Sequence, residues 1–115
     1  MLSRDSILAV SDFVLKTVNV PEWGGEVILK GLSSRDRDNF EAGISKDNDL
    51  NNLRARLVVK SIVDEAGKRL FKDRDADALG EKNAEVLGRL FEEVRNISGM
   101  SDEALGIAEE NLPTQ

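Results

Sequence analysis

Residues 16–32 read KTVNVPEWGGEVILKGL, and this stretch decides the fold class. Polar and apolar residues alternate over Lys16–Val20, and a second β-rich segment covers Glu26–Leu32. The five residues between them, Pro21–Gly25, include one proline and two glycines, which favours a turn. The pattern predicts a β-hairpin. Because an isolated hairpin is only marginally stable in water, this one must pack against helices or join another sheet.

Helical periodicity is found on both sides of the hairpin. Apolar residues recur at helical spacing over Arg4–Leu15, where Ser3 is placed to cap the helix. After the hairpin, Ser33 and Asp36 form the weaker, acidic version of a capping box. We expect the helix that starts there to run to residue 43 or 44, followed by a polar loop over residues 45–52.

The middle of the chain carries a broad apolar stripe that predicts a helix buried on more than one side. Its members are Leu50, Leu53, Leu57, Val58, Ile62 and Val63. Ala66–Lys68 should end this helix, and the extended stretch after it should place Leu70 and Phe71 on the core. Asp73 is then expected to cap a short helix, Arg74–Leu79, which Gly80 ends.

The strongest helical signal covers Lys82–Ser98, and Gly99 follows where a left-handed residue is favoured. Ser101 is placed to cap a last helix, on which Leu105, Ala108 and Leu112 share one face. The prediction is therefore a mainly α (α+β) fold. We expect a single compact multi-helix domain over residues 1–115, with a short β-hairpin near its N-terminus.

Composition excludes several classes of function. The chain has no cysteine and no histidine, which removes any thiol nucleophile, the commonest general base and the commonest metal ligands. Its formal net charge is −6, which argues against binding nucleic acid. No apolar run approaches the roughly 20 residues of a membrane span. We therefore predict no enzyme activity, no catalytic residues, no cofactor and no metal, with an enzyme or small-molecule binder as a remote alternative.

One acidic motif resembles a metal site but fails its spacing rule. Asp73, Asp75 and Asp77 occupy the first, third and fifth places of a calcium loop. Such a loop also needs glycine at the sixth place and glutamate at the twelfth, where this chain has Ala78 and Ala84. Helix capping is the preferred interpretation of these residues.

Protein surfaces are the remaining candidates for function. The residues we expect to bind a partner are Ile7, Leu8, Trp23, Leu105 and Leu112. Trp23 would act as an anchor if it is exposed; the alternative for all of these residues is ordinary packing on the chain's own core. Charge is also uneven, with a net of +4 over residues 54–74 and −5 over residues 92–115. Patches of opposite sign can steer a partner or a homo-oligomer, or simply be solvated helix faces.

Several phrases of the sequence resemble one family. Val20–Val27 reads VPEWGGEV and is similar to the Val-Pro-Glu-Trp-Gly-Gly-x-Val hairpin of tail assembly chaperones from long, non-contractile-tailed bacteriophages (siphophages) and their prophages. Arg54–Val58 and Val63–Phe71 resemble the arginine-rich helix and the Val-Asp-Glu-x-Gly-x-x-Leu-Phe segment of that family. The resemblance covers almost the whole chain, with mild departures at Ala66 and Ile97.

The resemblance implies a transient assembly factor in the host cytoplasm that is not expected in the mature virion. Such chaperones are thought to coat the tape measure protein and keep it soluble until tail tube protein polymerises around it. Many are also made in a frameshifted, extended form that recruits tail tube protein. The alternative is a structural tail connector or completion protein that is retained in the virion.

Overall fold

The predicted hairpin is confirmed and forms two strands of a three-stranded antiparallel sheet. The structure is a computed structural model that describes residues 1–100. Strand β1 (Leu15–Val20) pairs with β2 (Gly25–Lys30) without a break, from Leu15 opposite Lys30 to Val20 opposite Gly25. The turn between them is a 3₁₀ helix, η1 (Pro21–Trp23), and Gly24 follows it at φ 82°, a left-handed conformation that favours glycine. The fold class is thus α+β, as expected.

The third strand was not predicted. The apolar stripe over residues 50–63 is not one helix, because α3 (Leu53–Val58) ends early and Ile62–Val63 form strand β3 against β2. Buried Ser61 fixes this change, since its Oγ donates to the Lys30 carbonyl at 2.8 Å while its own carbonyl accepts from the Lys30 N–H at 2.9 Å. Two β-branched residues that pair with the central strand β2 outcompete helix periodicity here.

The expected N-terminal helix, Arg4–Leu15, is also too long. Helix α1 covers only Arg4–Ala9, with Ser3 as its cap, and Val10 is extended. The Val14 carbonyl accepts a hydrogen bond from the Gly31 N–H at 2.9 Å, so Val14 and Leu15 extend along β2 and are not part of a helix.

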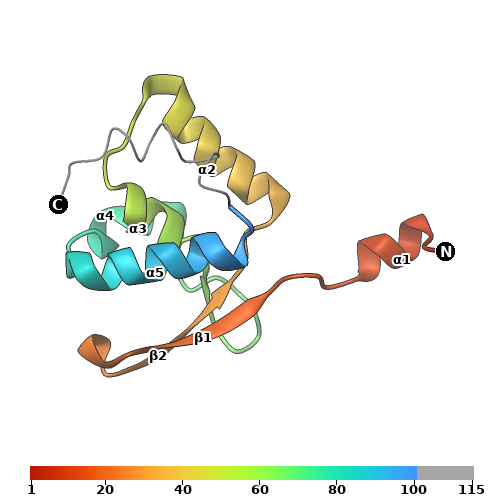
Figure 1. The fold of residues 1–115 in the computed structure, drawn as a ribbon, viewed down its shortest axis with the longest axis horizontal. Helices are drawn as coiled ribbons and strands as arrows, with labels where there is room; N and C mark the ends of the chain where they lie inside the picture. The colour runs from red at the N-terminus through yellow and green to blue at the C-terminus, as the bar shows by residue number, and fades with distance from the viewer. Residues whose placement is uncertain (101–115) are drawn as a thin grey trace.

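The other helices lie on one side of the β1–β2 hairpin, as Figure 1 shows, and α5 (Ala84–Ile97) is the helix that packs on its strands. Ser33 caps α2 (Ser34–Asp47) by accepting from the Asp36 N–H at 3.1 Å, and α2 runs beyond residue 44 to end at left-handed Asn48. Helix α5 is the predicted strong helix and is capped by Asn83. Gly99, at φ 65°, follows it as expected.

The core lies between the sheet and helices α3, α4 and α5. Its fully buried large side chains come from the strands and these helices: Leu29, Leu57, Ile62, Leu90 and Phe91. Residues 73–79 form a 3₁₀ turn, η2 (Asp73–Asp75), followed by α4 (Ala76–Leu79), and Gly80 ends α4 as predicted. A Cβ at Gly80 would lie 2.3 Å from the Asn52 side chain, so a larger residue there would displace that side chain.

Two expectations for the loop after β3 need correction. Leu70 does not join the core but is 57% exposed, whereas Phe71 does pack against the core. Asp73 does not cap the helix that follows; instead, the Asp75 carboxylate accepts from the Lys72 N–H at 2.7 Å. Over residues 1–100, no helix combines the length and apolar character that crossing a membrane requires.

The contact between the ends of β2 and α5 gives a first prediction. A Cβ at Gly31 would lie 2.6 Å from the Ile97 carbonyl oxygen, and backbone cannot move aside as a flexible side chain can. Gly31→Ala should therefore lower the free energy of unfolding by about 1–3 kcal/mol in urea denaturation.

Gly88 is the matched control, because it lies inside α5 with open space where a Cβ would stand. Gly88→Ala should leave stability unchanged or raise it by up to about 1 kcal/mol. Equal stability of the Gly31→Ala variant and the wild type would contradict the close contact.

Candidate partner-binding surface

The Asp73 carboxylate forms ion pairs within the chain. Asp73 accepts a hydrogen bond from Arg69 Nη2 at 2.8 Å and contacts Lys60 Nζ at 3.3 Å. The hydrogen bond from Arg69 is the largest cause that lowers the pKa of the Asp73 carboxyl. Among residues 1–100 there is no group of three acidic side chains placed to hold a metal ion. Asp73 therefore joins the loop after β3 to the end of α3.

The N-terminal arm, which we define as residues 1–14, is the most exposed apolar part of the described chain. No residue of α1 is buried, and Ile7 and Leu8 remain 51% and 68% exposed. Figure 1 shows α1 standing away from the rest of the domain. Large apolar side chains of this segment that remain exposed are Met1, Leu2, Ile7, Leu8, Val10, Phe13 and Val14. Such clustering on a small domain indicates an interaction surface.

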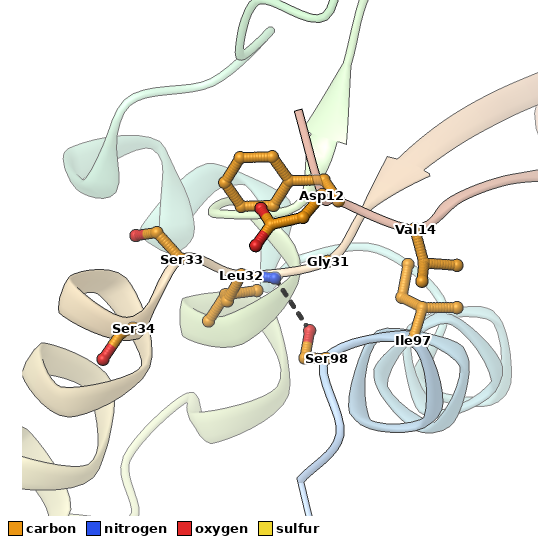
Figure 2. Close-up of a pocket in the computed structure, with 9 residues that line it drawn as sticks. Asp12, Val14, Gly31, Leu32, Ser33, Ser34, Ile97 and Ser98 are labelled. Carbon is orange, nitrogen blue, oxygen red and sulfur yellow. Dashed lines mark hydrogen bonds between the residues drawn. The ribbon is translucent and has the colours of Figure 1, made fainter. Parts of the chain in front are cut away.

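The end of the arm is fixed to the body of the domain. The Phe13 ring lies under Lys30, whose Nζ is 4.3 Å from the ring centroid. A pocket of about 300 Å³ forms at this junction, between the arm, the start of α2 and the end of α5, and Figure 2 shows Val14 beside Ile97 on its wall. The Leu32 N–H on this wall is satisfied by Ser98 Oγ at 3.0 Å. We call this pocket the joint, because the exposed arm meets the body of the domain there.

Trp23 occupies an intermediate position. The side chain is half-buried and packs against the core, which agrees with the interpretation that it covers the chain's own apolar residues. Part of the ring nevertheless stays accessible at the tip of the hairpin.

A bidentate ion pair holds the hairpin tip in place. Arg89 on α5 donates from both terminal nitrogens to Glu22, over 2.9 and 3.0 Å. The hydrogen bond from Arg89 lowers the pKa of the Glu22 carboxyl. Both residues are exposed, so the pair positions the tip more than it stabilises the fold.

Leu105 and Leu112, the other expected partner-binding residues, lie outside the described residues, as does the last helix on which they were placed. The arm and the Trp23 tip lie on separate parts of the domain. The arm leaves the start of β1, whereas the tip follows the other end of that strand. Among residues 1–100, the structure therefore does not bring Ile7 and Leu8 together with Trp23 in one site.

Comparison with known proteins decides the family. The sequence model of the phage tail assembly chaperone family matches residues 4–109 of this chain. The chain belongs to this family. The match includes the arm from Arg4 onward, the hairpin and all of the described helices.

A solved tail assembly chaperone has a similar fold. The structure entitled "Structure of bacteriophage HK97 tail assembly chaperone" matches with a TM-score of 0.62 and 22% sequence identity, over 81% of this chain and 90% of that one. At this identity the likeness concerns the fold alone. No curated protein matched the chain. The chaperone role thus comes from family membership, and the fold comparison agrees with it.

The Glu22–Arg89 pair gives a second prediction. The pKa of Glu22 is lower in the folded protein than its usual value of 4.5, so the pair stabilises the fold above that pH. This contribution should disappear as the pH falls through the lowered pKa. In thermal unfolding, the difference in Tm between wild type and Glu22→Gln should therefore shrink between neutral and acidic pH.

Glu26→Gln is the control, since it removes a carboxylate from the same hairpin without touching the Arg89 pair. A Glu22→Gln difference that stays constant down to the lowest measurable pH would show that the pair contributes nothing to stability.

Proposed function

We propose that this tail assembly chaperone binds the phage tape measure protein, keeps it soluble and promotes polymerisation of the tail tube around it. Family membership supports the chaperone role. The observation that supports a protein client is the N-terminal arm, whose helix α1 has no buried residue. A client with exposed apolar helix needs apolar side chains on its holder, and Ile7 and Leu8 supply them.

The energetics suit a transient holder. Burying an apolar side chain fully contributes roughly 1.5–3 kcal/mol, so an arm with a few such residues binds weakly on its own. Many copies along one long client would bind through avidity and would still exchange one at a time. That combination is what an assembly factor needs if tube subunits are to replace it.

The other expected residues have secondary places in this proposal. The accessible part of Trp23 adds contact area at the hairpin tip. Leu105 and Leu112 stay predicted client contacts. A frameshifted extended form would recruit tail tube protein, and the protein would act in the host cytoplasm, without nucleic acid or membrane and without remaining in the mature virion.

Co-expression tests the client directly. Tape measure protein made together with this chain should move from the pellet to the soluble fraction, and the two should co-purify. Purified virions should lack the chain, whereas a structural connector or completion protein would be found there. An insoluble client in the presence of well-folded chaperone would contradict the proposal.

Variants of the arm test the surface. Ile7→Ser combined with Leu8→Ser should reduce the soluble fraction of co-expressed tape measure protein while Tm stays within about 2 °C of wild type, because neither side chain is buried. Trp23→Ala is the contrasting variant: it removes a ring packed against the core, so Tm should fall by several degrees. If the arm variant retains full holding activity, the client binds elsewhere.

A further inference from the structure

In the part of the chain that the structure describes, the outer edge of β1 pairs with no other strand. The Gly31 N–H bonds to the Val14 carbonyl, whereas the Lys30 N–H bonds to the carbonyl of Ser61, just before β3. The backbone N–H and C=O groups of successive β2 residues therefore point in turn to β1 and to β3. The same alternation holds along β1, where the backbone groups of Val14, Lys16 and Val18 point to β2. The backbone N–H and C=O groups of Leu15, Thr17 and Asn19 therefore point outward.

The opposite edge of the sheet is not free. Val63 of β3 forms a bridge with Arg69, and the Leu70 N–H donates to the Ile62 carbonyl at 3.0 Å. Within residues 1–100, no segment pairs with the outer edge of β1. The sheet thus presents one open edge and one covered edge.

The open edge lacks the devices that usually prevent pairing between molecules. Strand β1 is six residues long, its register with β2 has no bulge, and it contains no proline. Its one charged side chain, Lys16, is engaged by Glu93 of α5 on the helix-covered face. No charge therefore projects from the edge to repel an approaching strand.

We propose that this edge pairs antiparallel with β1 of a second copy to form a six-stranded sheet across a two-fold axis. A second β1 fits this edge because a two-fold axis makes the two strands antiparallel. The outward N–H groups of each strand then meet the outward C=O groups of the other. With no acidic residue on either strand, pairing across Val18 sets Lys16 opposite Val20 and avoids like charges.

The position of the arm supports the same occupant. The arm leads directly into β1, so in this pairing residues 10–14 of one copy pass beside the hairpin tip of the other. Exposed Val10 and Phe13 would then lie near the accessible part of the partner's Trp23. The two arms would leave the shared sheet at opposite ends, each with α1 still exposed.

Thr17→Pro tests the pairing. Proline removes an outward N–H and no bond to β2, and edge strands accept it. Sedimentation equilibrium of the purified chain should show a dimer for wild type and a Kd raised roughly tenfold for Thr17→Pro, since two-fold pairing loses two hydrogen bonds. Thr17→Val, which keeps the N–H, is the matched control and should dimerise like wild type.

A cysteine variant covers the case in which Thr17→Pro does not fold. The chain has no cysteine, so a single introduced thiol is unique. Pairing across Val18 sets this residue opposite itself, so oxidised Val18→Cys should form a covalent dimer readily. Glu65→Cys, an exposed site on the loop after β3, should remain monomeric.

Three results would overturn the proposal. These are a wild type that stays monomeric at the highest attainable concentration, a folded Thr17→Pro variant with the wild-type Kd, and equal cross-linking of the two cysteine variants. The double variant Ile7→Ser with Leu8→Ser should leave the dimer intact. If this double variant is monomeric while Thr17→Pro still dimerises, the arm and not the edge of β1 holds the two copies together. Because no tape measure protein is present, these outcomes are independent of the proposed client.

Discussion

The contact between Gly31 and the Ile97 carbonyl is the constraint on which the arrangement of the domain depends. Strand β2 is paired on both sides, and its last residues turn into α2 just where α5 ends. The Leu32 N–H bonds to Ser98 at the same point, and the Val14 carbonyl bonds to Gly31. Sheet, arm and two helices therefore meet at a place where only a residue without Cβ fits.

The sequence predicted correctly the elements that are specified by residues close together in the chain. The alternating strands around Pro21–Gly25, the cap at Ser33 and the periodic stripe of α5 could all be read from neighbouring residues. Strand β3 could not, because two branched residues become a strand only by pairing with β2, more than thirty residues earlier in the chain. Val14 and Leu15 are extended for the same reason, because they bond to or pair with the end of β2.

The candidate surface was predicted in part. Apolar residues at helical spacing singled out Ile7 and Leu8, but spacing does not say whether such a face meets the chain's own core or another protein. Only the fold shows that α1 buries nothing. For Trp23 the fold gave the opposite result, because the turn brings the ring back against the core. The open edge of β1 had no sequence signal, since it depends on the order of the strands.

The meeting point at Gly31 also has a consequence for biosynthesis. Leu32 and its hydrogen-bond partner Ser98 are 66 residues apart in the chain. At translation rates of about 5–20 residues per second, the hairpin emerges roughly 3–13 s before the end of α5 can close the joint. During that interval the hairpin lacks α5, the helix that packs on β1 and β2, so the domain can be completed only after the ribosome has made the end of α5.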